Sequence, residues 1–162
     1  MIITFAGHSK LTAREALKER LTSTLLSLLP KEEKISFFCG GYGDFDALCA
    51  EVCRAIASAR DHCEVLLITP YITESHQKRL KEIQKSDLYD GTLYPPLERV
   101  PPRLAILKRN EWMVEASDLV IAFVTHTFGG AYKTVAYARK KKKRVINLAE
   151  PPPPSEVRVK EE

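Results

Sequence analysis

Residues 118–142 of the 162-residue chain read DLVIAFVTHTFGGAYKTVAYARKKK, and this stretch decides the fold class. After its aspartate, the segment 118–124 is apolar at every position rather than at every second one, which predicts a strand covered on both faces. The loop THTFGG follows, and 130–142 then has a helical pattern that ends in basic residues. A buried strand that runs directly into a helix is the repeating unit of a parallel α/β sheet.

The same alternation of apolar strands and helices continues before and after this stretch. We expect further strands at 2–6, 34–39, 64–69, 90–94 and 144–148, and further helices at 11–29, 45–60, 73–86 and 103–116. Asp44 is the expected N-cap of the helix at 45–60. Right-handed crossovers between such strands give a three-layer, doubly wound α/β domain with a mostly parallel, Rossmann-like sheet.

The length and hydropathy of the chain fit one domain. A hydrophobic content of 44% is ordinary for a chain that buries its own core, which we place at 1–149. The last residues, 150–162 (EPPPPSEVRVKEE), predict an extended, disordered tail. No apolar run approaches the roughly 20 residues of a membrane helix, and 1–10 (MIITFAGHSK) has no export-signal pattern. We therefore expect a cytoplasmic protein without membrane contact.

The four cysteines have no CxxC spacing. Cys49 and Cys53 lie four residues apart on one helix face, beside apolar residues and with no histidine nearby, so they predict core packing rather than a metal site. Cys39 and Cys63 complete the set. Reduced thiols fit a cytoplasmic protein, and we expect neither metal nor cofactor.

The formal net charge of +4 comes from one run, RKKKKR at 139–144. Without these six residues, 19 basic and 21 acidic residues remain. The run lies at the end of a predicted helix, where cations complement the helix dipole. A single local patch argues against nucleic acid as a partner, although an interaction module that uses this run or an apolar helix face stays open as an alternative.

Three loops after predicted strands carry residues suited to ligand binding: Gly7-His8-Ser9, the GGYGDFD loop at 40–46, and Phe128-Gly129-Gly130 followed by Tyr132. The carboxyl ends of parallel strands meet at one edge of the sheet, where helix N-termini point. Glycine amides at such N-termini can donate to a phosphate. The donors we expect are Gly40, Gly41, Gly43, Gly129 and Gly130. Each loop, taken alone, is also consistent with a structural turn.

Arg109 and Asn110 are a polar pair within the largely apolar helix at 103–116. An arginine there can bind a phosphate through two parallel hydrogen bonds. We expect His8, Asp46 and Asn110 to contact a sugar or base, with Gly7, Ser9 and Tyr132 completing the site. These expectations require that the stretches around Tyr42 and Phe128 lie side by side and share one cleft.

The motifs GGYGDFD (40–46) and RNEWMVEASDLVIAFVTHTFGG (109–130) resemble the SLOG superfamily, which includes the DprA/SMF, YpsA-like and LOG proteins. The resemblance covers most of residues 1–148. TPYITES (69–75) and YPPLE (94–98) are similar to small, uncharacterised YpsA-like proteins. The resemblance implies a Rossmann-like fold, a nucleotide-like ligand and a dimer or higher assembly.

LOG enzymes hydrolyse the N-glycosidic bond of nucleoside monophosphates, and the chain departs from their pattern. Arg109, Met113 and Gly129-Gly130 match it, but Phe128 replaces the proline, Lys133 the threonine and Ala136 the catalytic glutamate. Hydrolysis needs a carboxylate, which would then be Asp46, with Asp44 and Glu74 as alternatives.

The sequence therefore favours a domain that binds a nucleotide or nucleotide-derived small molecule, as a sensor or carrier. A nucleoside-phosphate N-glycosidase or ribosyl transferase is the second hypothesis, with Asp46 as the candidate catalytic residue. The interaction module without a small ligand is the third.

Overall fold

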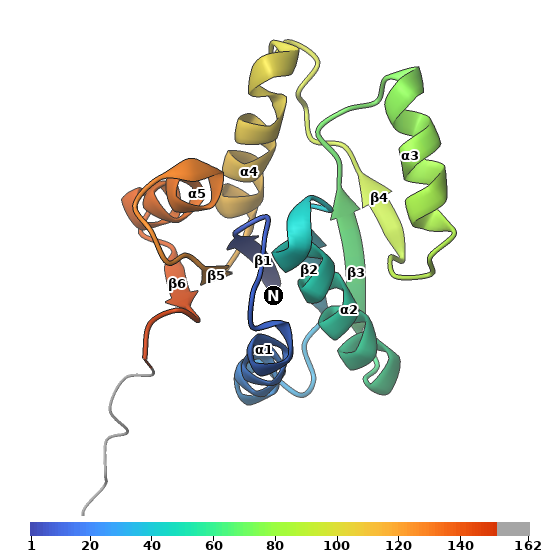
Figure 1. Ribbon diagram of the computed structural model, residues 1–162. Coiled ribbons are helices and arrows are strands. Elements are labelled where there is room, and N and C mark those ends of the chain that lie inside the picture. Colours follow the sequence, from blue (N-terminus) through green and yellow to red (C-terminus); the bar gives the residue numbers. More distant parts are fainter. Residues whose placement is uncertain (152–162) are drawn as a thin grey trace, which may run out of the picture.

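A computed structural model describes residues 1–151, with Gln84 described by its backbone only. Six strands form one sheet in the order β4-β3-β2-β1-β5-β6, and all of its pairings are parallel (Figure 1). The strands are β1 (Ile2–Gly7), β2 (Ile35–Cys39), β3 (Cys63–Ile68), β4 (Gly91–Leu93), β5 (Leu119–Phe123) and β6 (Arg144–Asn147). The predicted doubly wound α/β fold is confirmed.

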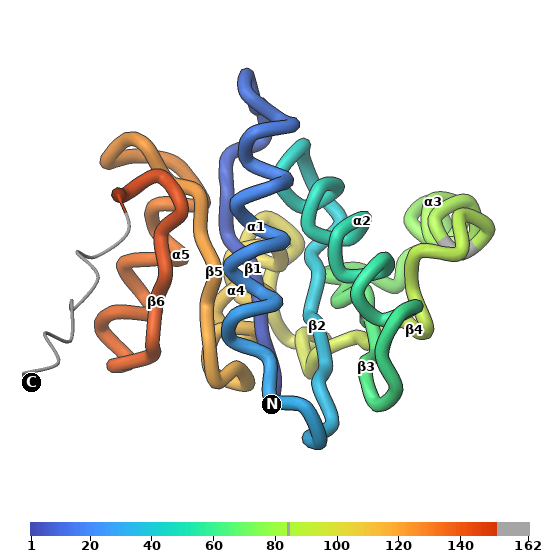
Figure 2. The backbone as a smooth tube through the Cα atoms, turned by 90° about the horizontal axis from the view of Figure 1, so that it is seen from below, coloured from blue at the N-terminus to red at the C-terminus, as the bar shows by residue number. Residues whose placement is uncertain are grey.

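Helices cover both faces of the sheet. α1 (Arg14–Leu28) and α2 (Gly43–Ala59) lie in front of the sheet in Figure 2, while α4 (Ala105–Ala116) and α5 (Gly129–Lys140) lie behind it. α3 (Glu74–Gln84) lies beside the β4 edge, and none of its described side chains is buried. A short 3₁₀ turn, η1 (Pro102–Leu104), precedes α4 and accounts for the start of the predicted helix 103–116. Proline favours this first turn because it has no N–H to leave unpaired.

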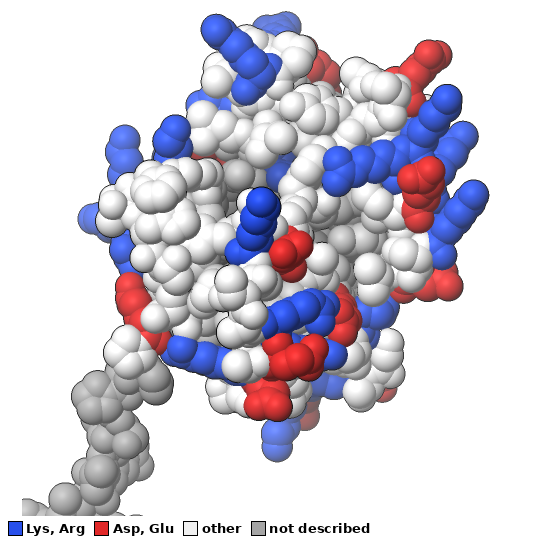
Figure 3. All heavy atoms as spheres, in the orientation of Figure 1, with Lys and Arg blue, Asp and Glu red and all other residues white. Residues whose placement is uncertain are grey.

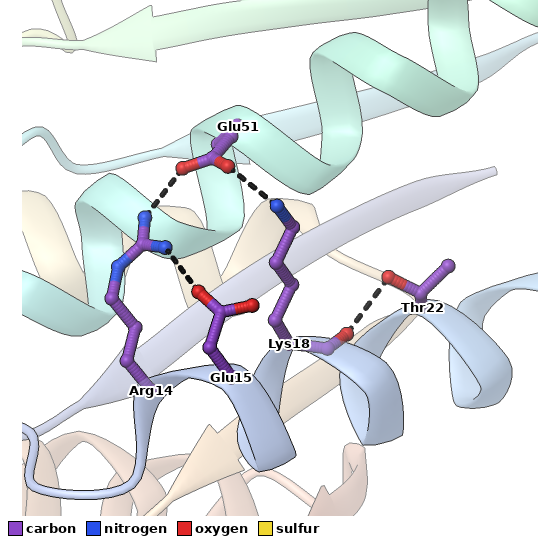
Figure 4. Close-up of polar contacts among 5 residues, drawn as sticks. All are labelled: Arg14, Glu15, Lys18, Thr22 and Glu51. Atoms are coloured by element: carbon purple, nitrogen blue, oxygen red, sulfur yellow. Dashed lines mark hydrogen bonds and ion pairs between the residues drawn. The ribbon is translucent and has the colours of Figure 1, made fainter.

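The main core lies between the sheet and helices α1 and α2. Leu17, Leu21 and Leu25 form the buried stripe of α1, and Phe45 and Leu48 of α2 are completely buried. Glu51 of α2 adds a polar contact above this core, because it forms ion pairs with Arg14 and Lys18 of α1 (Figure 4). These three side chains are partly exposed, so apolar burial rather than charge holds α1 on α2.

The strand order places a topological switch point between β1 and β5. From β1 the chain moves outward through β2, β3 and β4, and it then returns to the other side of β1 to form β5 and β6. The loops that follow β1 and β5 therefore lead to helices on opposite faces of the sheet. Such a point leaves a crevice at the carboxyl ends of the two strands, where open α/β sheets bind their ligands.

Asp44 is not the N-cap of α2, contrary to the sequence-based prediction. The helix begins at Gly43, so Tyr42 is the N-cap and Asp44 lies inside the first turn. Its carboxylate instead accepts a hydrogen bond from the Leu11 amide at 3.1 Å, and its own amide donates to the Ser9 carbonyl at 2.9 Å. Asp44 therefore fixes the loop after β1. The predicted tail at 150–162 lies, from 152 onward, outside the described residues.

Candidate functional site

A cleft of about 640 Å³ opens at the switch point, beyond the carboxyl ends of β1 and β5. Nine of the twelve predicted ligand-binding residues line it: Gly7, His8, Ser9, Gly40, Asp46, Arg109, Asn110, Gly129 and Gly130. Tyr42 and Phe128 also line it, so the loops after β2 and β5 share one cleft, as the sequence predicts. The sequence-based reasoning missed Thr125, His126, Ile106 and Thr134, which the cleft also contains.

Gly41, Gly43 and Tyr132 do not line this cleft. Gly41 and Gly43 have φ values of +75° and +85°, and a Cβ on Gly43 would lie 2.7 Å from Ser9 Cα. These two glycines are therefore required by the backbone and its packing. Tyr132 borders a separate depression between α4 and α5 that Leu107 and Tyr137 also line.

Arg109 joins the ends of two strands from inside the domain. Its side chain comes from α4 and is only 2% exposed. Nη1 donates to the carbonyl oxygens of Gly40 and Ile68, each at 2.7 Å, while Nε donates to Asn110 Oδ1 at 3.0 Å. Nη2 donates to no other residue within 1–151, so it remains available to a ligand in the cleft.

Asp46 faces Arg109 across Gly40 without forming an ion pair with it. The point that a Cβ on Gly40 would occupy is 2.8 Å from Asp46 Oδ2 and 3.2 Å from Arg109 Nη2. Any larger residue would fill this space. Burial raises the pKa of Asp46 to about 6, although the Tyr42 amide, which donates to Oδ2 at 3.0 Å, and the Arg109 charge act to lower it. Asp46 is therefore a carboxyl group that exchanges protons near neutral pH.

The Asp46→Asn variant should unfold at higher urea concentration than the wild type at pH 7.5. Because the pKa of Asp46 is higher in the folded than in the unfolded protein, its contribution to stability is present at pH 4 and is lost as the pH rises through 6. The side-chain amide of the Asp46→Asn variant does not ionise, so this stability is not lost at high pH, and its oxygen still accepts the hydrogen bond from the Tyr42 N–H. We expect a gain of about 1–3 kcal/mol at pH 7.5 and almost none at pH 4.

Asp90→Asn is the matched control, since its effect should have the opposite sign. Burial acts to raise the pKa of Asp90, but hydrogen bonds from the Val65 amide (2.8 Å) and Arg54 (3.0 Å) lower it below the ordinary value. Replacing the Asp90 carboxylate with an amide should therefore lower the free energy of unfolding at neutral pH. If Asp46→Asn is no more stable than the wild type at pH 7.5, Asp46 is not held in the environment described above.

The two glycine-containing loops differ in their suitability for an anion. The first turn of α2 carries Asp44 and Asp46, and the Tyr42 amide is already hydrogen-bonded to Asp46. The first turn of α5 carries no acidic residue, and a Cβ on Gly129 or Gly130 would meet no atom within 4 Å. The positive end of the α5 dipole therefore faces open space in the cleft, whereas that of α2 is compensated by carboxylates.

Three rings form a stacked column on one wall of the cleft. The His8 and His126 rings are 3.9 Å apart and differ by 6° in orientation, and the His126 and Phe128 rings are 4.0 Å apart. His8 Nε2 accepts a hydrogen bond from the Thr125 amide at 2.8 Å, which requires that this nitrogen carry no proton. Burial and the neighbouring His126 lower the pKa of His8, so the ring is neutral at physiological pH.

Asp46 is the one carboxylate among the described residues that line the cleft. Glu74 and Asp44, the alternative acids, do not line it, and Ala136 is exposed on α5 outside it. Acid–base chemistry in this cleft would therefore use Asp46, His8 or His126.

Residues 1–151 lack the features of a metal site and of a membrane-spanning helix. This part of the chain holds no group of three or more histidine, cysteine or acidic residues that could bind a metal ion. Cys39, Cys49 and Cys53 are buried in the core as free thiols. None of the helices in this part of the chain is both long and apolar enough to span a membrane.

The basic run at 139–144 lies at the opposite edge of the sheet, because it joins the end of α5 to the start of β6. Lys143 Nζ donates to the carbonyl oxygens of Glu115 and Ser117, both at 2.9 Å. Lys141 forms an ion pair with Glu115 at 3.4 Å. These contacts hold α5 against the end of α4, which accounts structurally for part of the run.

No protein-family model matches the chain. Its fold is similar to that of DNA processing protein A (DprA) from Helicobacter pylori, with a TM-score of 0.60 and 16% identity over 90% of this chain. It is similar to DprA from Streptococcus pneumoniae as well, with a TM-score of 0.58 and 13% identity over 88% of this chain. The chain shares its fold with part of each DprA chain. It spans 63% and 48% of these two DprA chains.

The resemblance to the DprA group is thus confirmed in its fold. The chain is also 23% identical, over 140 residues, to the uncharacterised SPbeta prophage-derived protein YoqJ of Bacillus subtilis; the match covers 76% of this chain and 81% of YoqJ. The DprA structures correct one expectation. The solved structure of H. pylori DprA describes a unique mode of binding single-stranded DNA, and this contradicts the expectation that nucleic acid is an unlikely partner. The net charge of a protein does not predict whether it binds nucleic acid, because a cleft can bind a single strand through a few local residues.

Proposed function

We propose that the chain binds a nucleotide or a nucleotide-derived small molecule in the switch-point cleft, as a cytoplasmic sensor or carrier. The observation that carries this proposal is the open N-terminus of α5, where Gly129 and Gly130 face the same cleft as the buried Arg109. Helix amides and a guanidinium that still has unused donors are the groups that bind phosphate.

The remaining polar groups suit the sugar and base. Asp46 and Arg109 Nη2 lie on either side of Gly40, so they offer an acceptor and a donor to one ligand group. His8 and Asn110 also line the cleft. The four cysteines are free thiols, which supports a reducing compartment.

Isothermal titration of the purified protein with nucleoside mono-, di- and triphosphates tests the proposal. We expect saturable binding of at least one of them with a Kd below about 1 mM, and no binding of the corresponding nucleosides at the same concentration. Absence of saturable binding across the panel at millimolar concentration would contradict the proposal.

Single-stranded nucleic acid is the second candidate ligand, and it is favoured by the DprA structures and by the surface next to the cleft. Lys and Arg side chains gather over α3, at the right of Figure 3. One of them, Arg79, lies 4.4 Å from the centre of the Tyr42 ring and donates to the Gly41 carbonyl. Basic side chains beside exposed aromatic rings are typical of surfaces that bind single strands. Tighter binding of a short oligodeoxynucleotide than of any mononucleotide would favour this candidate.

A further inference from the structure

The proposed phosphate site does not use the stacked column of His8, His126 and Phe128. The last ring of this column, Phe128, is 68% exposed and lines the cleft. We propose that Phe128 is the platform on which the base of the ligand stacks, so that the site selects nucleotides that carry a large aromatic base. This inference rests on the proposed function and adds the ligand class.

The column is held in place before any ligand arrives. His8 follows β1 directly, and its ring is fixed by hydrogen bonds with the amide and hydroxyl of Thr125, at 2.8 and 3.1 Å. His126 stacks on His8, and Phe128 stacks on His126 at an angle of 29°. A base on the outer face of Phe128 would extend a stack whose geometry is already set, with little ordering of protein side chains.

The exposure of Phe128 also points to an apolar partner in the cleft. Four large apolar side chains are exposed within residues 1–151: Leu26, Ile72, Ile106 and Phe128. Phe128 is the most exposed of them, and Ile106, which is 39% exposed, lines the same cleft. A flat ring that covers Phe128 would remove this apolar surface from water.

The spacing of the two binding elements along the chain suits a nucleotide. Phe128 directly precedes Gly129 and Gly130, whose amides are the proposed phosphate donors. In a nucleotide, a single sugar separates phosphate from base. A phosphate at the start of α5 would therefore leave the base next to the residue that precedes the helix.

Competition binding to the wild type and to Phe128→Leu tests the platform. The probes are AMP, UMP and ribose 5-phosphate, where the last carries the phosphate and sugar without a base. For the wild type we expect affinity to fall in the order AMP, UMP, ribose 5-phosphate, with about 10-fold or more between the first and the last. Phe128→Leu should lose most of this difference while binding ribose 5-phosphate as the wild type does, and Phe128→Trp should keep it.

Ile72→Ala is the control, because Ile72 is an exposed apolar residue that does not line the cleft. It should leave all three affinities unchanged. If Phe128→Leu binds AMP as tightly as the wild type, the base does not stack on Phe128, but the proposed function is unaffected. If none of the phosphates binds the wild type, the proposed function itself fails.

The base could belong to a free nucleotide or to the end of a strand, and a fourth probe separates these sources. Short 5′-phosphorylated oligodeoxyadenylate should also lose affinity in Phe128→Leu if its terminal base uses the platform. Tighter wild-type binding of the oligonucleotide than of AMP assigns the site to a strand end, and the reverse assigns it to a free nucleotide. An oligonucleotide that binds equally well to both proteins would not use the platform, which would then serve free nucleotides alone.

Discussion

Replacing Arg109 with methionine should lower the free energy of unfolding by about 2–4 kcal/mol. The guanidinium is buried and donates to the carbonyl oxygens of Gly40 and Ile68, which lie at the ends of β2 and β3. Methionine has a similar length but no donor, so both carbonyl groups would lose a partner at the base of the cleft. The substitution also removes the desolvation cost of burying the charged guanidinium. This gain is smaller than the loss of the two charge-assisted hydrogen bonds. Urea unfolding at pH 7.5 measures the effect.

Arg79→Met is the matched control for this experiment. Arg79 is exposed on α3, and its contacts within residues 1–151 are a long hydrogen bond, 3.4 Å, to the Gly41 carbonyl and a ring contact with Tyr42. Its loss should change stability by less than about 0.5 kcal/mol. If Arg109→Met were as stable as the wild type, the guanidinium would not be fixing the strand ends, and the shape of the cleft would need another cause.

Replacing Gly130 with aspartate should reduce nucleotide affinity by about 100-fold without destabilising the fold. A Cβ at this position meets no atom within 4 Å, so the side chain has room. A carboxylate in the first turn is favourable for the helix by about 0.3–1 kcal/mol. The same carboxylate would, however, place a negative charge where the phosphate is proposed to bind. Calorimetric titration together with thermal unfolding separates the two effects.

Gly130→Ala is the control for charge, because it adds the same Cβ without a carboxylate. It should bind within a few-fold of the wild type. Gly7, in the same cleft, has no such room for a side chain, because a Cβ there would lie 2.1 Å from the Phe45 ring. If Gly130→Asp binds nucleotides as tightly as the wild type, the phosphate does not bind at the start of α5.

The fold was predictable because the strands are apolar at nearly every position. Segments such as 64–69 and 118–124 can satisfy that pattern only when helices cover both faces of a parallel sheet. The position of the cleft followed from the same reasoning, since all strands point the same way and their carboxyl ends share one edge. The start of α2 could not be predicted in the same way. Asp44 is a residue type that often caps helices, but its carboxylate instead accepts a hydrogen bond from the Leu11 amide.

The roles within the cleft were less predictable, because they depend on distances between loops. GGYGDFD has more glycines than THTFGG, yet Gly41 and Gly43 serve the backbone and the first turn of α2 is acidic. Tyr132 follows Gly130 by only two residues, but two residues correspond to about 200° around a helix, so its side chain faces the depression between α4 and α5. The stacking of His126 on His8 joins residues 118 positions apart, and no local pattern could reveal it.

A crystal structure of the protein with a bound nucleoside 5′-monophosphate, grown or soaked at millimolar ligand, tests the central claim most directly. We expect the phosphate within hydrogen-bond distance of the Gly129 and Gly130 amides, with Arg109 beside the ligand. A nucleotide bound away from the switch point, or a cleft that stays empty while the ligand occupies another surface, would contradict the claim.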